Sequence, residues 1–257
     1  MVLTRGHPFL YASWINSITF MAVTYLQLTN ELLRRLNEVV MDSSDFATAR
    51  NIQALAKDAV NSAIREILHS AQEWPFAITT YTETLVVGTK EYSFQSDMSS
   101  VDWDSFYLKI LTSVDNAPAK LRLITFDDYL TNYRANEDLA GTSGRTAPVY
   151  VYQTQESKYG VSPIPDAAYE VEYKYWTFPS DLSVSTDTTI IPERFKNVII
   201  DGAMMYMMLF RSNEQSAVIH KDKFDTGIRM MRRLLLDDPV SVRSSFILRP
   251  VFYPRFF

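Results

Sequence analysis

The chain contains no cysteine and only three histidines among its 257 residues. The absence of cysteine excludes disulfide bonds, thiolate metal ligands and cysteine nucleophiles, and it is compatible with a reducing compartment. His7, His69 and His220 show none of the spacings that metal sites use, so we interpret them as ordinary surface or core residues. The sequence therefore predicts no metal site and no cofactor.

The chain also lacks a hydrophobic run long enough to span a membrane. Its most apolar stretch, residues 198–210, contains Asp201 and is shorter than the ~20 apolar residues that a spanning helix needs. The first twenty residues have some features of a signal peptide, but Asn16 and Ser17 interrupt the apolar run and no small-residue cleavage site follows. We expect residues 1–20 to be an upstream extension or a loose arm, and a native product whose intact mass begins at Met1 would contradict this.

The overall charge is small for a chain of this length. A formal net charge of -5 gives the whole chain no general attraction to nucleic acid. The composition, with 47% hydrophobic and 21% charged residues, is typical of a folded globular protein. The length allows one large domain or two small ones with a sizeable core.

Helical signals dominate the first part of the chain. A capping box predicts that a helix begins at Thr24, whose hydroxyl accepts from the amide of Gln27 while the Gln27 side chain reaches back. Apolar residues then recur at helical spacing and should face the core, which predicts a helix over residues 24–40; they are Tyr25, Leu28, Leu32, Leu36 and Val39. A second, alanine-rich helix is expected over 46–72, ended by Trp74-Pro75, and it should pair with the first as an antiparallel hairpin.

The apolar pattern changes from a period of 3.6 to a period of 2 in the middle of the chain. Residues 78–87 and 90–94 are predicted to form a β-hairpin around the turn Gly88-Thr89. Strict alternation makes 169–176 the clearest strand. Thr125-Phe126-Asp127-Asp128 opens a short helix between strands. Further strands are expected over residues 106–114, 121–124 and 149–154.

Helical signals return near the C-terminus. Pro192 is expected at the first position of a methionine-rich helix, and a further helix is expected over residues 213–236. The methionines at 204–208 are typical of adaptable core and subunit packing. The sequence thus predicts an α+β protein, whose parts are an α-helical bundle (21–76 and 191–239), a central antiparallel β-domain (77–190) with a helical insertion (126–136), and an extended C-terminal arm (240–257).

The last eighteen residues differ in composition from the body. They hold five aromatics, three arginines and two prolines, with no acid and no glycine. Pro250 and Pro254 each remove a backbone donor, so this segment is not expected to form a regular element. Because the arm carries three of the positive charges, the rest of the chain has a net charge of -5 - 3 = -8. We predict that the arm docks on a partner surface.

Four motifs, taken in order, resemble the head-to-tail adaptor proteins of short-tailed bacteriophages. They are Thr24-Tyr25-Leu26-Gln27-Leu28, Trp74-Pro75-Phe76, the block Leu121-Arg122-Leu123-Ile124-Thr125-Phe126-Asp127-Asp128-Tyr129, and Ile191-Pro192-Glu193 before the methionine-rich helix. The resemblance covers roughly residues 21–239, and residues 1–20 have no counterpart in the family pattern.

This resemblance implies a structural virion protein and no enzyme. It implies a dodecameric ring of identical subunits at the head-tail junction, built in the host cytoplasm, that joins the portal protein to the tail nozzle or tail fibre proteins. Double-stranded DNA would pass through its channel without sequence-specific binding. The arm would dock on the portal through Phe246, Leu248, Arg249, Phe252, Tyr253, Arg255, Phe256 and Phe257.

Two other interpretations stay open at this stage. The acidic pairs Asp102/Asp104, Asp127/Asp128 and Asp237/Asp238 are the residue type that a virion-associated peptidoglycan hydrolase needs, although helix starts and turns explain them better. The chain could also be another neck or nozzle subunit. In addition, residues 137–148 lack the spacing of a phosphate loop, and we interpret them as a polar loop. It is either a mobile connection or a contact with a neighbouring subunit or the tail, and the contact residues would then be Leu139, Gly141, Gly144 and Arg145.

Overall fold

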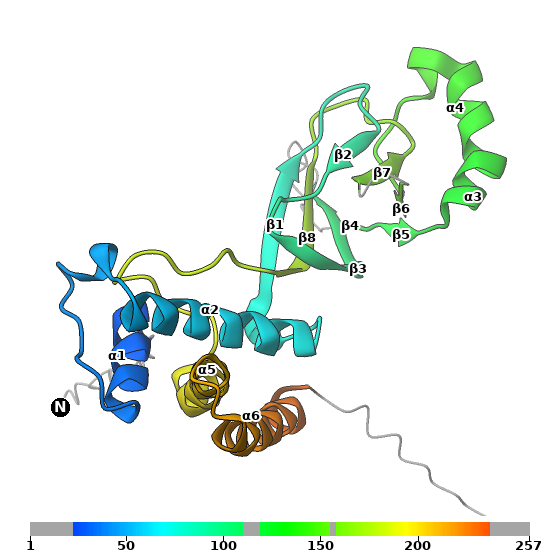
Figure 1. The fold of residues 1–257 in the computed structure, drawn as a ribbon. Coiled ribbons are helices and arrows are strands. Elements are labelled where there is room, and N and C mark those ends of the chain that lie inside the picture. The colour runs from blue at the N-terminus through cyan, green and yellow to red at the C-terminus, as the bar shows by residue number, and fades with distance from the viewer. Residues whose placement is uncertain (1–22, 110–118, 155–157, 237–257) are drawn as a thin grey trace, which may run out of the picture.

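The four longest helices gather at one end of the protein, and the strands with a short helical insertion lie at the other (Figure 1). The computed structural model describes residues 23–109, 119–154 and 158–236. Along the chain the order is helices, strands with a helical insertion, then helices, so the predicted α+β class is confirmed. The polypeptide crosses between the two ends twice, once into the first strand and once out of the last.

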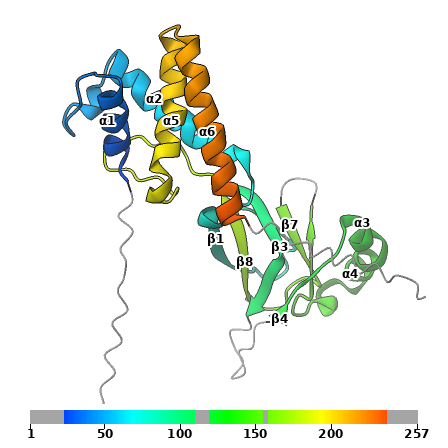
Figure 2. The same ribbon diagram turned by 90° about the horizontal axis from the view of Figure 1, so that it is seen from below.

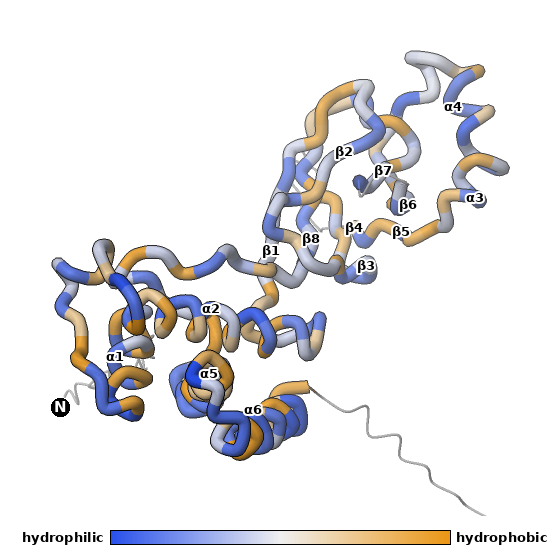
Figure 3. Tube along the Cα trace, viewed as in Figure 1, coloured by the Kyte–Doolittle hydropathy of each residue, from blue (hydrophilic) through white to orange (hydrophobic). Residues whose placement is uncertain are grey.

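Four helices make up the helical part. They are α1 (Tyr25–Arg35), α2 (Ile52–Ser70), α5 (Lys196–Phe210) and α6 (Glu214–Leu235). Helix α5 contacts each of the other three, so the first and last helices of the chain share one core. Hydrophilic and hydrophobic residues alternate along α2 and α6 (Figure 3), as expected of helices with one buried face.

Helix α1 begins as predicted but ends early. The hydroxyl of Thr24 accepts from the backbone amide of Gln27 at 3.2 Å, and the Thr24 amide donates to the Gln27 side chain at 3.0 Å. The helix stops after Arg35 because Asn37 adopts a left-handed conformation, with φ of 57°. Val39, predicted to face inward, is instead 77% exposed.

The second helix is shorter than predicted. A left-handed conformation at Asn51, with φ of 51°, separates α2 from a single 3-10 turn, Phe46–Thr48. Phe46 is buried there against Tyr25, with ring centroids 5.0 Å apart. The predicted antiparallel hairpin is wrong, because α1 crosses α2 in Figure 1 instead of running alongside it.

The strands form two four-stranded sheets that share one core. The first has the order β1-β8-β3-β4 and the second the order β2-β7-β6-β5. The strands of the first sheet are β1 (Ile78–Thr84), β8 (Glu170–Thr177), β3 (Met98–Lys109) and β4 (Ala119–Lys120). Those of the second are β2 (Glu91–Ser93), β7 (Lys158–Ser162), β6 (Tyr150–Gln153) and β5 (Arg122–Leu123).

Strand pairing departs from the prediction in three respects. β1 and β2 do not form a hairpin, because β1 pairs with β8 while β2 pairs with β7 in the other sheet. Gly88 does form a turn between them, with φ of 80°. The sheets are not wholly antiparallel, since β5 pairs with β6 in parallel. Finally, the chain changes sheets at Leu121, so the strand predicted over 121–124 is reduced to β5, and β4 directly before it belongs to the other sheet.

Two other strands follow the sequence pattern well. In β8 the side chains of Val171, Tyr173 and Tyr175 are buried, and those between them are more exposed, as the alternation predicts. β6 lies within the predicted strand. The sequence analysis missed β7, and it placed the start of β3 eight residues too late, at Phe106 instead of Met98.

The helical insertion is longer than predicted. It consists of α3 (Phe126–Asp128), a π-helical turn (Tyr129–Tyr133), α4 (Arg134–Ala140) and a 3-10 turn (Gly141–Gly144). The predicted polar loop at 137–148 is therefore largely helical. Figure 1 shows the insertion at the far end of the strand part, away from α1 and α2.

The C-terminal helices match the prediction closely. Pro192 takes the cap position before a 3-10 turn that leads into α5. It was predicted at the first helical position, so the turn begins one residue later than predicted. Asn213 caps α6 by accepting from the amide of Ser216 at 3.1 Å. Close helix approach requires Gly202, because a Cβ atom there would lie 2.6 Å from the Phe224 ring.

Candidate functional site

The predicted portal-binding arm lies outside the described residues. This applies to Phe246, Leu248, Arg249, Phe252, Tyr253, Arg255, Phe256 and Phe257, as well as to residues 1–20 and the pair Asp237/Asp238. The described chain ends at Leu236, directly after α6. Leu236 borders a cavity together with Pro75 and Trp176, at the junction of the helical and strand parts.

The predicted contact loop is a helical segment attached to the second sheet. The Glu137 carboxylate accepts from the hydroxyl of Ser162 at 2.6 Å and from that of Tyr129 at 3.0 Å. The Tyr129 ring stacks on Tyr152 with centroids 4.1 Å apart. These contacts join the insertion to β6 and β7, so it presents a defined surface.

The four residues proposed for this contact are not brought together into one patch. Leu139 is 87% exposed on α4, and Gly141 and Gly144 lie in the following turn. The guanidinium of Arg145 instead packs over Gly88, where a Cβ atom would meet it at 3.1 Å. Leu139 is thus the apolar side chain of this set that faces solvent.

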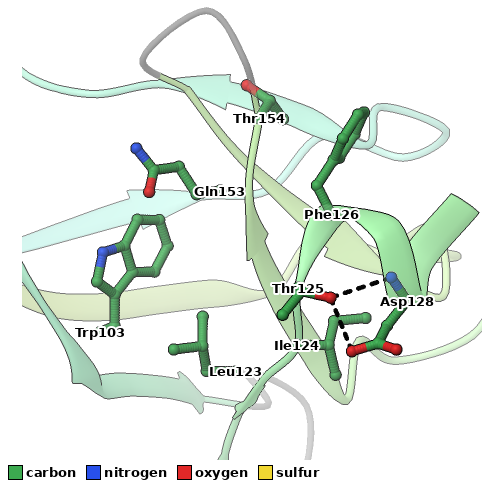
Figure 4. A pocket seen from close by; sticks show the side chains of 8 residues that line it. All are labelled: Trp103, Leu123, Ile124, Thr125, Phe126, Asp128, Gln153 and Thr154. Atoms are coloured by element: carbon green, nitrogen blue, oxygen red, sulfur yellow. Dashed lines mark hydrogen bonds between the residues drawn. The ribbon is translucent and has the colours of Figure 1, made fainter.

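A cavity of about 610 Å³ lies where the insertion leaves the sheet. Figure 4 shows Trp103, Leu123 and Phe126 around it, with Gln153 and Thr154 at its edge. It was not predicted from the sequence, because Leu121 and Leu123 are both leucine and only the structure shows that the first is buried and the second exposed.

Three of the carboxylates near this cavity have local hydrogen-bond or ion-pair partners. The Thr125 hydroxyl donates to Asp128 at 2.7 Å and accepts from the Asp128 amide at 3.1 Å, so Asp128 serves the start of α3 (Figure 4). Asp102 accepts from the amide of Asp104, and Asp104 pairs with Lys120 at 3.2 Å. Asp128, Asp102 and Asp104 therefore have structural partners, in keeping with the interpretation of these residues as parts of turns and helix starts.

Tyrosine hydroxyls are the most perturbed groups of the strand part. Burial, followed by the hydrogen bond to Glu83, raises the pKa of Tyr159 far above its ordinary value. The hydrogen bond to Asp166 raises the pKa of Tyr169 to about 12. Burial also raises the pKa of the Glu83 carboxyl, opposed by its bond from Tyr159. These tyrosines stay protonated at neutral pH and act as hydrogen-bond donors within the core.

The histidines and methionines occupy packing positions. His69 lies against Phe178 with ring centroids 4.5 Å apart, and His220 lies 3.5 Å from Asp201. Met204, Met205 and Met207 are buried, in keeping with the predicted core role. Within 23–109, 119–154 and 158–236 no group of three or more potential ligand side chains could hold a metal ion. His7 lies outside these ranges.

Charged residues on the helices mostly have local partners. Arg65 pairs with Asp181 at 3.3 Å, and Arg211 pairs with Glu38. Arg229 donates to the Asp225 carbonyl and to the Thr226 hydroxyl, both in its own helix. None of the helices in the described part is long and apolar enough to cross a membrane.

Comparison with known proteins supports the resemblance that the motifs suggested. The family model described as SU10 adaptor protein matches residues 23–244, which is most of the chain and includes both the helical and the strand parts. The match begins one residue before the cap of α1 and extends a few residues into the predicted arm. No curated protein matches the sequence. The chain belongs to the SU10 adaptor protein family, a family of phage head-to-tail adaptors, and it is a structural adaptor of the virion.

Proposed function

We propose that this protein is the subunit of a ring that joins the portal to the tail at the head-tail junction of a short-tailed phage. The observation that carries the proposal is the adaptor-family match over residues 23–244. The shape of the chain supports it, since helices and strands at opposite ends provide separate surfaces for two neighbours (Figure 1).

The C-terminal arm is the portal-binding segment in this proposal. Its aromatics supply apolar contact area, and Arg249 and Arg255 supply donors for carboxylates or carbonyls of the portal. Free subunits should be monomeric, and the portal should trigger assembly into a homo-dodecamer. The strand part then meets the tail nozzle or tail fibre proteins, with the exposed Leu139 among its contacts.

The charge of the body suits a DNA channel. A wall that lets a duplex slide should neutralise few phosphates, because each neutralised phosphate releases counterions and strengthens binding. Without the three arginines of the arm the chain has a net charge of -8, from -5 - 3. The DNA is therefore a passing, non-specific partner.

The decisive experiment removes residues 244–257 and measures binding to the portal of the same phage. We expect the truncated protein to remain folded by circular dichroism but to lose portal binding. A full-length variant with Phe252, Tyr253, Phe256 and Phe257 changed to Ala separates side-chain contacts from arm length. Undiminished portal binding by both variants would refute the role of the arm, and negative-stain images lacking a ring would refute the adaptor assignment in favour of another neck subunit.

A further inference from the structure

The outer face of α6 carries exposed apolar side chains in a row. Ile219, Met230 and Leu234 are spaced by eleven and four residues, which places them on one side of a helix. Met230 and Leu234 are 60% and 69% exposed, while Phe224 and Met231, which face the helical core, are fully buried. Folding of the monomer therefore does not explain this apolar row.

Basic residues lie between these apolar side chains. Lys223, Arg229 and Arg233 share the outer face with a single acid, Asp222, which gives a net charge of +2. Within the described part of the chain, Lys223 and Arg233 have no ion-pair partner, and Arg229 bonds only to its own helix. These cations are available for a partner with acidic groups.

The connection between α1 and α2 carries exposed apolar and acidic residues, which complement the apolar and basic face of α6. Val39 and Val40 are exposed there, close to the exposed carboxylates of Asp42 and Asp45. With Glu38 and Arg50 included, residues 37–50 have a net charge of -2. Val39 was predicted to face the core. Its exposure beside Asp42 and Asp45, which have no ion-pair partner within the described part of the chain, needs a different explanation.

This connection is held firmly in place. The Asn30 side chain bonds to both the amide and the carbonyl of Met41, each at 2.8 Å. Met41 itself is buried, and the Gln53 side chain donates to the Val39 carbonyl at 3.3 Å. The chain thus fixes an apolar and acidic surface outward instead of folding it into the core.

The two surfaces lie on opposite sides of the helical part. Figures 1 and 2 both place α1 and the connection after it on one side of α5, and α6 on the other. Both α1 and α6 contact α5. Two different, complementary surfaces on opposite sides of a subunit are the requirement for head-to-tail association, which closes into a ring when the rotation between subunits allows it.

We infer that the outer face of α6 in one copy docks against the α1–α2 connection of the next copy. Lys223, Arg229 and Arg233 then face Asp42 and Asp45, and the apolar side chains of the two surfaces cover each other. A two-fold contact of α6 with α6 would instead bring like charges together, which disfavours it. The inference rests on the proposed ring and specifies the subunit contact within it.

Charge reversal on each surface tests the contact. Asp42→Lys with Asp45→Lys, or Lys223→Glu with Arg229→Glu and Arg233→Glu, should each lower ring formation at least tenfold when the full-length protein is mixed with its portal. Combining both sets should restore much of the loss. Glu73→Lys with Glu91→Lys is the matched control, since both side chains are exposed and lie outside the two surfaces.

The absence of native cysteine allows a direct check of the geometry. Ser44→Cys and Thr226→Cys introduce one thiol into each surface. Under oxidation on portal-assembled rings, a mixture of the two single variants should form cross-linked dimers, whereas each variant alone should not.

The outcomes separate the two proposals. Rings that tolerate both charge reversals, or that cross-link through one variant alone, would overturn the α6 contact and leave the adaptor ring standing. If the unaltered protein forms no ring with its portal, the proposed function and the contact both fall.

Discussion

The helical part and the strand part are held together by different chemistry. Among the described residues, the helical core contains one buried tyrosine, Tyr25, in an otherwise largely aliphatic, alanine and methionine set. Tyrosines supply five of the twelve buried residues in the strand core. Helical packing depends on close apolar fit, whereas the strand core combines ring stacking with hydroxyl bonds to distant acids. The first kind of core is marked in the sequence by periodicity, and the second depends on which partners tertiary folding supplies.

Among the variants that compare the two parts, Phe224→Ala is expected to have the largest effect on stability. Phe224 is fully buried against Gly202 of α5, so truncation leaves a cavity between the last two helices. The free energy of unfolding should fall by about 3–5 kcal/mol. Urea unfolding followed by the helical signal in circular dichroism measures this. Met230→Ala, on the exposed face, should cost less than about 0.5 kcal/mol, and an equal loss for both variants would contradict the assignment.

Tyr159→Phe tests the hydroxyl bonds of the strand core. The change keeps the ring but removes the donor that reaches the Glu83 carboxylate at 2.5 Å, and it leaves that half-buried acid without this partner. The expected loss is about 1–3 kcal/mol. The measurement is denaturant unfolding followed by tryptophan fluorescence, to which Trp103 contributes because it packs against this core. Tyr107→Phe, on an exposed position of β3, is the matched control and should be nearly neutral.

A smaller effect is expected at the start of α1, where a single side chain supplies the cap. Thr24→Ala removes an acceptor from the Gln27 amide and should cost about 1 kcal/mol. The partner change Gln27→Ala removes the reciprocal bond at 3.0 Å and should cost less, because Gln27 is exposed. Thermal unfolding of both variants gives the comparison, and a neutral Thr24→Ala would show that the cap contributes nothing to the helical part.

The smallest effect concerns pH. Burial raises the pKa of Glu83 in the folded protein, so the folded state holds this proton more tightly than the unfolded chain does. Stability should therefore fall as the pH rises from the ordinary glutamate value through the raised one, and then level off. Glu83→Gln should flatten this part of a plot of melting temperature against pH. If Glu91→Gln, at an exposed position, flattens it equally, Glu83 is not the group responsible.

Local signals in the sequence predicted the helices well. The cap at Thr24 lies where the sequence placed it, and α6 begins directly after Asn213, the predicted first residue of that helix. Both side chains accept from an amide three residues away. The errors at the ends of α1 and the start of α2 arise at Asn37 and Asn51. Both adopt left-handed conformations, and the segment between them buries Met41 and Phe46, a tertiary packing arrangement that no local pattern encodes.

Strand pairing was predicted less well, for a different reason. β1 and β2 have the composition of a hairpin and a turn at Gly88, yet β1 pairs along its whole length with β8, about ninety residues later. The missed strand β7 contains Gly160, which weakens the strand signal. That glycine is needed because a Cβ atom would lie 2.2 Å from the Tyr152 ring.

The candidate contact surfaces were also predicted only in part from the sequence. The composition of residues 240–257 indicates a docking arm, and it stays a prediction because these residues lie outside the described ranges. Leu139 was chosen from the sequence, but its helical setting and the anchoring of Glu137 were not predicted. The acidic face at Asp42 and the basic face of α6 were missed, because periodicity alone does not say which side of a helix its neighbours cover.

By itself, the sequence determined the α+β class, the main helices, the clearest strand, the adaptor motifs and the absence of cysteine chemistry. Tertiary structure alone decided which strands pair, where the insertion packs and which apolar side chains remain exposed. The physical reason is the range of the interactions. Capping bonds and apolar spacing act over a few residues and can be read directly, whereas strand partners and exposed faces depend on contacts between segments far apart in the chain.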